Sequence, residues 1–125
     1  MLALWENAGD GIRLRDSDRP DEIKKKIQRD PDLFLVARIE DVIVGTVLGG
    51  FDGRRGFIYH LAVAEAFRRS GIARQLMDEV ENRLQKKGCR KCYLLVTPDN
   101  QSAMDFYDKL GYEKMPVIPF GKRLR

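Results

Sequence analysis

The stretch FIYHLAVAEAFRRSGIARQ, residues 57–75, predicts the passage from a buried strand to a helix on which the fold depends. Its first half is a run of large apolar residues typical of a strand, and its last residues begin an amphipathic helix. The loop between them contains Arg68, Arg69 and Gly71. Free backbone N–H groups at a helix start, with arginines beside them, suit a phosphorylated ligand. We therefore expect the rest of the chain to position other groups against such a ligand.

Two apolar runs before this stretch predict a hairpin. They are LFLVARI (33–39) and VIVGTVLGG (42–50), and only two residues separate them. A glycine-containing turn at 51–56 leads into the strand at 57–63, so the three strands should form an antiparallel meander. Because apolar residues occupy both faces of the first two runs, helices are expected on both sides of the sheet. Candidate helices at 1–8 and from Asp18 to about residue 30 precede the meander.

The second half of the chain predicts two more helices and one strand. Apolar residues four apart over 72–87 indicate a long helix that Gly88 ends. The run CRKCYLLVTP (89–98) follows as a strand, and its helical crossover favours pairing parallel to 57–63. Asn100 is a candidate N-cap of a third helix, which Gly111 closes. The proline-broken tail can hold at most one short edge strand.

Composition favours a single globular domain over residues 1–125. The chain is 43% hydrophobic and 34% charged, which suits one core. It shows neither the roughly 20 consecutive apolar residues of a membrane span nor a basic leader, so we expect a cytoplasmic protein without a membrane partner. The net charge of +4 is mild and dispersed. A small anionic ligand is therefore favoured over nucleic acid, and a basic nucleic-acid module stays the weaker alternative.

Cys89 and Cys92 form a CxxC pattern, which invites a zinc or redox interpretation. In a strand, positions three apart point to opposite faces, and the chain has no second cysteine pair and only one histidine. We therefore predict structural roles for both cysteines and no metal site. Two free thiols fit a reducing compartment.

Two motifs in this order resemble the GNAT superfamily of acyl-CoA N-acyltransferases. RRSGIA (68–73) fits the pattern Q/R-x-x-G-x-G/A, and NQSAMDFYDKLGY (100–112) fits N-x-x-A-x-x-F-Y-x-x-x-G-[FY]. The resemblance covers about residues 33–113. It implies an α/β GNAT fold with a central mixed, mostly antiparallel sheet and helices on both faces. The family's usual first strand is not found before the first predicted helix: either it is absent, or the natural start lies upstream of residue 1. If it is absent, the edge of the strand at 33–39 would be exposed, which invites pairing with another chain, as in a homodimer.

The resemblance also implies the reaction, which is transfer of an acetyl group from acetyl-CoA to a primary amine by direct attack in a ternary complex. The acceptor would be a small molecule or a peptide, which the sequence does not identify. The backbone of the strand would hold the pantetheine arm, the loop would hold the pyrophosphate, and Asn100 would touch the arm or a water, or serve only as an N-cap. The cofactor-binding residues implied in this way are Leu61, Ala62, Val63, Arg68, Arg69, Ser70, Gly71, Ile72, Ala73 and Asn100.

Tyr107, by the same resemblance, would be the general acid that protonates the leaving thiolate. The base is less defined: the candidates are Tyr59, His60 and Glu65, or a chain of waters. Of the side chains we favour His60, although strand alternation places it on the opposite face from Tyr59. The main alternative function is a GNAT-fold protein that binds acyl-CoA without turnover or serves as a regulatory partner.

Overall fold

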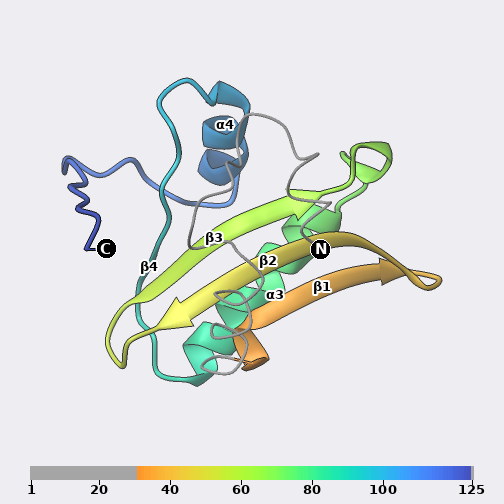
Figure 1. The fold of residues 1–125 in the computed structure, drawn as a ribbon, viewed down its shortest axis with the longest axis horizontal. Coiled ribbons are helices and arrows are strands. Elements are labelled where there is room, and N and C mark those ends of the chain that lie inside the picture. The colour runs from red at the N-terminus through yellow and green to blue at the C-terminus, as the bar shows by residue number, and fades with distance from the viewer. Residues whose placement is uncertain (1–30, 125) are drawn as a thin grey trace.

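The computed structural model describes residues 31–124. The helices predicted at 1–8 and 18–30 lie outside the described residues. The prediction that the family's first strand is missing also concerns that part of the chain. Figure 1 shows a sheet crossed by one long helix, with a second helix beyond one end of it. In chain order the elements are η2 (Pro31–Leu33), β1 (Phe34–Ile39), β2 (Val42–Phe51), β3 (Gly56–Val63), η3 (Glu65–Phe67), α3 (Ile72–Lys86), β4 (Cys92–Tyr93) and α4 (Gln101–Lys109).

The sheet has the order β1-β2-β3-β4. The first three strands pair antiparallel as a meander, and β4 pairs parallel to β3 after the α3 crossover. This arrangement confirms the predicted α/β class and the mixed, mostly antiparallel sheet. Within residues 31–124, no helix has the length and apolar character needed to cross a membrane.

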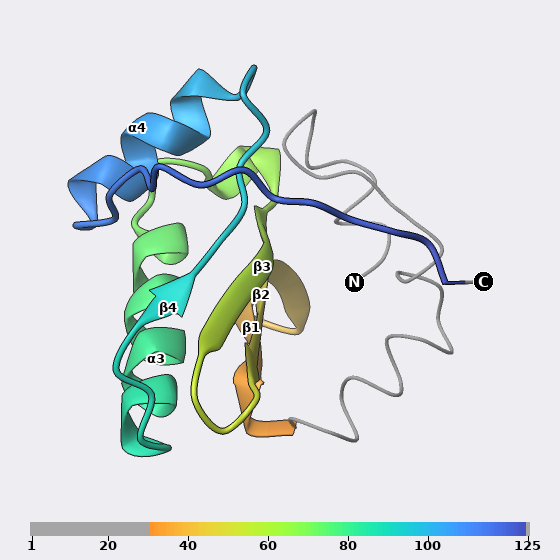
Figure 2. The same ribbon diagram turned by 90° about the vertical axis from the view of Figure 1, so that its left-hand side faces the viewer.

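The core lies between α3 and one face of the sheet. The apolar stripe predicted for the helix is confirmed, because Leu76, Val80 and Leu84 are buried against the sheet. A Cβ on Gly45 of β2 would contact Leu76, so this glycine marks the face toward α3. Figure 2 shows α3 and α4 on the same side of the sheet. The other face also buries strand residues, namely Val44, Thr46 and Leu48.

The strand predicted over 89–98 is much shorter in the structure. Only Cys92 and Tyr93 pair with β3, opposite Gly56 and Phe57. The chain then leaves the sheet and runs to α4, and Figure 1 shows the two backbones diverging. Leu95, in the apolar run that suggested a longer strand, is 79% exposed. An apolar run signals strand propensity but does not say how far a neighbouring strand stays beside it.

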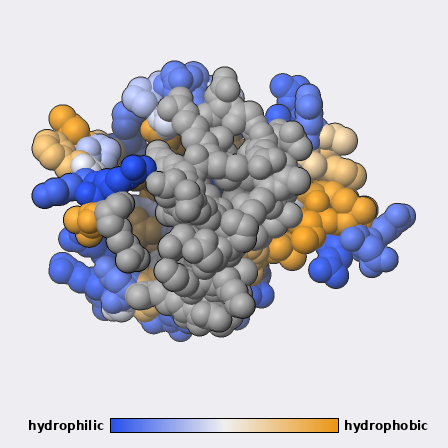
Figure 3. Space-filling model, viewed as in Figure 1, coloured by the Kyte–Doolittle hydropathy of each residue, from blue (hydrophilic) through white to orange (hydrophobic). Residues whose placement is uncertain are grey.

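β1 lies at the outer edge of the described sheet. Ile39 and Val42, at the β1–β2 hairpin, are 42% and 62% exposed. Figure 3 shows an apolar patch over this end of the two strands. Pairing of this edge with a second copy stays a prediction.

Gly56 should be sensitive to a small increase in size. A Cβ at this position would lie 2.7 Å from Cys89 Sγ and 3.3 Å from Leu84 Cδ1. Gly56→Ala is therefore expected to lower the free energy of unfolding by about 1–3 kcal/mol through overpacking. Urea denaturation measures the change. Gly121→Ala is the control, because a Cβ there meets nothing within 4 Å; equal stability of the two variants would contradict the packing described.

Candidate functional site

A β-bulge interrupts β3 in front of the loop. Thr46 pairs with Ala62 and Leu48 pairs with Tyr59, so His60 and Leu61 both face the single intervening residue of β2. His60 has a φ of 55°, which is uncommon for a residue with a side chain. Two residues opposite one, with an irregular φ, define a bulge, and bulges often redirect side chains near functional sites.

The bulge changes the face on which His60 lies. The His60 and Tyr59 rings meet edge to face, with centroids 5.7 Å apart at 75°. The prediction that the two residues lie on opposite faces is therefore wrong, because the extra residue resets the alternation of the strand. Ile58 faces the α3 core, so Tyr59 and His60 lie together on the sheet face away from α3. Glu65, the third candidate base, is exposed beyond the strand in η3.

The far edge of β3 is open beyond its short pairing with β4. Ala64 N donates to Val44 O at 2.8 Å, so the backbone of Ala64 faces β2. Because backbone groups alternate along a strand, those of Val63 and Leu61 face the opposite edge. Among the described residues, β4 covers that edge only at Gly56 and Phe57. Two of the three strand residues predicted to hold a cofactor thus reach the edge, whereas Ala62 is in register with Thr46 of β2.

The predicted loop begins at this edge. Arg68 Nε donates to Val63 O at 3.1 Å, which ties the loop back to the last strand residue. Ser70 Oγ donates to Phe67 O. Arg69 adopts a φ of 65° and Gly71 a φ of 88°. A left-handed conformation costs a residue with a Cβ roughly 1–2 kcal/mol, so Arg69 is held in place by the surrounding loop.

The start of α3 presents unpaired backbone donors to the loop side. Gly71 is the N-cap without a side-chain capping bond, and Gln75 N makes the first helical bond, to Gly71 O at 3.0 Å. The N–H groups of the three residues between them therefore have no bond inside the helix. A Cβ on Gly71 would meet nothing within 4 Å. Open space before a helix N-terminus is a site where an anion is stabilised.

Asn100 is confirmed as the N-cap of α4. Its Oδ1 accepts from Ala103 N at 3.1 Å and from Ser102 Oγ at 3.2 Å. Sequence reasoning missed a group just before it: Thr97 Oγ1, in the diverging segment, is buried without a hydrogen-bond partner in the described part of the chain. A buried hydroxyl without a partner costs about 1–3 kcal/mol, so this oxygen is available to a ligand or water that reaches the segment.

Tyr107 lies half-buried on α4, between two other aromatic rings. Its ring centroid is 5.2 Å from that of Phe106 and 5.8 Å from that of Tyr112. No described residue forms a hydrogen bond with its hydroxyl. Burial raises the pKa of Tyr107 to about 12, because a phenolate would lose its hydration. The side chain is therefore a neutral phenol with a free hydroxyl at physiological pH.

This raised pKa predicts a loss of stability in alkali. The pKa of Tyr107 rises from 10.0 to about 12 on folding, so its stabilising contribution is complete below pH 10 and disappears as the pH rises through 12. Two pKa units correspond to about 2–3 kcal/mol. Tyr107→Phe should remove this part of the decline in unfolding free energy between pH 10 and 12, measured by urea denaturation. Parallel declines in both proteins would contradict the assignment.

The two cysteines are free thiols, but they do not face opposite sides of the sheet as predicted. Cys89 precedes the two-residue strand and is buried in the core under α3, and Cys92 packs against that same core. Strand alternation does not apply to the pair because Cys89 is not in the strand. Within residues 31–124, no cluster of three or more His, Cys, Asp or Glu side chains is arranged to hold a metal ion.

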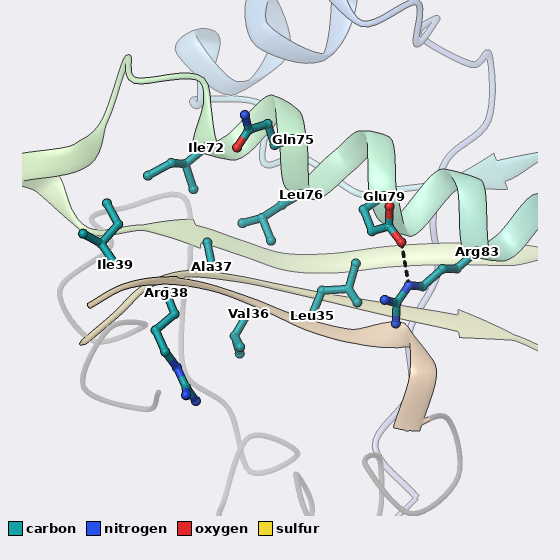
Figure 4. Close-up of a pocket in the computed structure, with 10 residues that line it drawn as sticks. All are labelled: Leu35, Val36, Ala37, Arg38, Ile39, Ile72, Gln75, Leu76, Glu79 and Arg83. Atoms are coloured by element: carbon teal, nitrogen blue, oxygen red, sulfur yellow. Dashed lines mark hydrogen bonds and ion pairs between the residues drawn. The ribbon is translucent and has the colours of Figure 1, made fainter. Parts of the chain in front are cut away.

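A groove of about 470 Å³ lies elsewhere, between β1 and α3. Figure 4 shows it bordered by Leu35, Ala37 and Ile72, with the Arg83–Glu79 ion pair at one end. Of the predicted site residues only Ile72 lines it. This groove therefore adjoins the start of α3 at Ile72 but includes none of the residues of β3.

Comparison with known proteins shows the family to which the chain belongs. The chain matches the family described as "Acetyltransferase (GNAT) family" over residues 3–112. It belongs to the GNAT acetyltransferase family. A protein named acetyltransferase from Pectobacterium atrosepticum is 43% identical over 99% of this chain and 86% of its own length. Another from Yersinia enterocolitica is 41% identical with the same coverage.

Solved structures share the GNAT fold. Ard1 from Thermoplasma volcanium superposes with a TM-score of 0.75 at 25% identity, over 88% of this chain and 74% of that protein. AAC(6')-Iy, in complex with the bisubstrate analogue CoA-S-monomethyl-acetylneamine, gives a TM-score of 0.70 at 25% identity, over 97% and 85%. The α/β GNAT fold predicted from the two motifs is thereby confirmed.

Proposed function

We propose that this GNAT protein, acting as one domain, transfers an acetyl group from acetyl-CoA to a primary amine by direct attack in a ternary complex. One observation carries the proposal: the open edge of β3 leads, through the loop at 64–71, to the exposed N–H groups of α3. An extended chain that ends in a pyrophosphate matches this order of groups. The bisubstrate complex of AAC(6')-Iy supports coenzyme A and a small-molecule amine as the reactants.

In this proposal the pantetheine arm adds to the sheet as an extra strand beside β3. Strand addition relies on backbone hydrogen bonds, here those of Leu61 and Val63. Val63 O already accepts from Arg68 Nε at 3.1 Å, but a carbonyl has two lone pairs and can also accept from an amide of the arm. Arg68 would then lie between the arm and the pyrophosphate.

The pyrophosphate would lie at the start of α3, where the helix dipole and three unpaired N–H groups favour negative charge. Arg69 and Ser70 are exposed in the adjoining loop, and Ile72 and Ala73 begin the helix. We assign these residues with Gly71 to the phosphate site. Asn100 Oδ1 is occupied by its capping bonds, so its amide nitrogen is the group we propose for contact with the arm or a water.

Tyr107 is our proposed general acid. Its pKa of about 12 guarantees the proton but also makes it a weak donor. Against a free thiolate with a conjugate-acid pKa of about 8.5, transfer would be uphill by about 3.5 units, or about 5 kcal/mol. A thiolate leaving into the same buried environment also loses hydration, which raises its own pKa and narrows this gap. Tyr107 therefore protonates the sulfur best when water is excluded.

The attacking amine needs a proton acceptor. Holding a lysine-like amine of pKa about 10.4 neutral at pH 7 costs roughly 4.6 kcal/mol. We assign this role to His60, directly or through water, since an imidazole nitrogen can accept a proton and pass it on. The bulge supports the assignment because it places His60 with Tyr59 on the sheet face away from α3. The proposed base then lies on β3, whereas the pyrophosphate of the acetyl donor would bind at the loop and the start of α3.

Two measurements test the proposed function. Calorimetry should detect acetyl-CoA binding at a single site, and an assay of CoA thiol release should identify accepted amines in a panel of amino acids, peptides, polyamines and aminoglycosides. No binding of acetyl-CoA or CoA would contradict the proposal. Binding with no turnover on any amine would instead favour an acyl-CoA-binding protein.

A further inference from the structure

The end of α4 is closed by a Schellman motif that includes the proposed acid. Gly111 turns the chain with a φ of 94°. Tyr112 N then donates to Tyr107 O, and Gly111 N donates to Asp108 O, each at 3.0 Å. This pair of bonds brings the residue after the glycine back onto the last turn of the helix. Tyr112 is therefore fixed to the backbone of Tyr107.

The side chain of Tyr112 connects this turn to α3. Its ring meets the Tyr107 ring at 74°, with centroids 5.8 Å apart. Its hydroxyl donates to Glu81 Oε2 at 2.6 Å, and Cys92 Sγ lies 3.4 Å from the same hydroxyl. A short bond from a hydroxyl to a carboxylate is stronger than a bond between neutral groups. One side of the Tyr107 ring thus rests on a ring that is anchored at both ends.

Glu81 forms no salt bridge with a lysine or arginine among residues 31–124, whereas Glu79, two residues earlier, pairs with Arg83. Burial, together with Cys92 and Glu81, raises the pKa of Tyr112 well above its ordinary value, so the hydroxyl remains a donor. Glu81 also lies on the helix whose first residue follows Gly71. The contact therefore joins the helix of the proposed phosphate site to the helix of the proposed acid.

We propose that the Glu81–Tyr112 hydrogen bond is a positioning element that holds the Tyr107 hydroxyl in its reactive orientation. This inference rests on the proposed role of Tyr107 as general acid. The motif quoted above has Phe or Tyr at position 112, so the motif by itself does not require the hydroxyl that binds Glu81. Without the bond, the ring of residue 112 keeps its apolar contacts, but its hydroxyl end is no longer held by Glu81. The Tyr107 ring then packs against a neighbour that can move.

Single variants separate positioning from binding. Tyr112→Phe should lower kcat about 10- to 100-fold, because misplacement of a reacting group by about 1 Å has an effect of this size. The KM for acetyl-CoA should change less than about twofold, since the loop is untouched. Glu81→Leu should match Tyr112→Phe, and Glu81→Gln, which keeps an acceptor oxygen, should recover most of the loss. Tyr112→Phe with unchanged kcat, or Glu81→Gln no better than Glu81→Leu, would overturn the proposal.

A double-mutant cycle distinguishes this inference from the function on which it rests. Combined with Tyr107→Phe, Tyr112→Phe should cause no further loss of kcat, because there is no acid left to position. Full multiplication of the two losses would contradict positioning and indicate a general structural defect, which thermal denaturation would show. If Tyr107→Phe alone leaves kcat unchanged, the acid assignment fails. If it lowers kcat but Tyr112→Phe does not, only the positioning role fails.

Discussion

Tyr107→Phe should lower kcat by about 10²- to 10⁴-fold and leave the dissociation constant for acetyl-CoA nearly unchanged. The substitution removes one hydroxyl that forms no hydrogen bond within the described chain, so the ring contacts with Phe106 and Tyr112 remain. Only an interaction made in the transition state is lost. Steady-state kinetics with an accepted amine gives kcat, and calorimetry with acetyl-CoA gives the dissociation constant.

Tyr93→Phe is the matched control for this prediction. It also removes one phenol hydroxyl from a ring in an aromatic pair, since the rings of Tyr93 and Phe57 lie with their centroids 5.7 Å apart at a tilt of 34°. We expect wild-type turnover from this control. A Tyr107→Phe enzyme as active as the control would end the assignment of Tyr107 as the acid.

Gly71→Glu should abolish detectable binding of acetyl-CoA. A Cβ on Gly71 would enter space in which no atom lies within 4 Å, directly before the unpaired N–H groups of α3. The new carboxylate can occupy those donors itself and repels a pyrophosphate. The φ of 88° adds backbone strain, which costs roughly 1–2 kcal/mol of stability but does not by itself unfold the protein. Calorimetry with acetyl-CoA measures the loss.

Gly53→Glu is the control that distinguishes loss of the phosphate site from the effect of backbone strain. Gly53 has a φ of 99° and, like Gly71, would place its Cβ where nothing lies within 4 Å. It is in the β2–β3 turn, at the opposite end of β3 from the loop. This control adds the same charge and a similar strain, and it should bind acetyl-CoA as the wild type does. Normal binding by Gly71→Glu, or equal loss in both variants, would contradict the proposed phosphate site.

Local patterns predicted the parts of the site that local interactions form. The four-residue spacing from Ile72 gave the length of α3 to within one residue, and the position of Asn100 gave the cap of α4. These features rest on contacts between residues at most four apart, which propensity and capping rules describe well. The two motifs also predicted the fold, because their order and spacing resemble those of a whole family of proteins.

Pairing between distant strands could not be predicted in the same way. Strand alternation predicts the wrong face for His60 because the register of β2 against β3 sets the bulge, with one residue of β2 facing two of β3. The length of β4 depends on where its backbone leaves β3, after only two pairs. The apolar residues of β3 and β4 are equally compatible with continuous strand pairing. No local sequence pattern therefore indicates the bulge in β3 or the short pairing of β4.

By itself, then, the sequence determined the order of elements, the loop that opens α3 and the helix that carries Tyr107, since short-range hydrogen bonds and apolar spacing are written into neighbouring residues. The tertiary structure alone decided which groups meet: His60 beside Tyr59, Leu61 and Val63 on an open edge, and Tyr112 on Glu81. These contacts join residues that are distant in the sequence, and they depend on strand register and on helix packing. Register and packing are set when the whole core packs together, so no single segment of the sequence determines them.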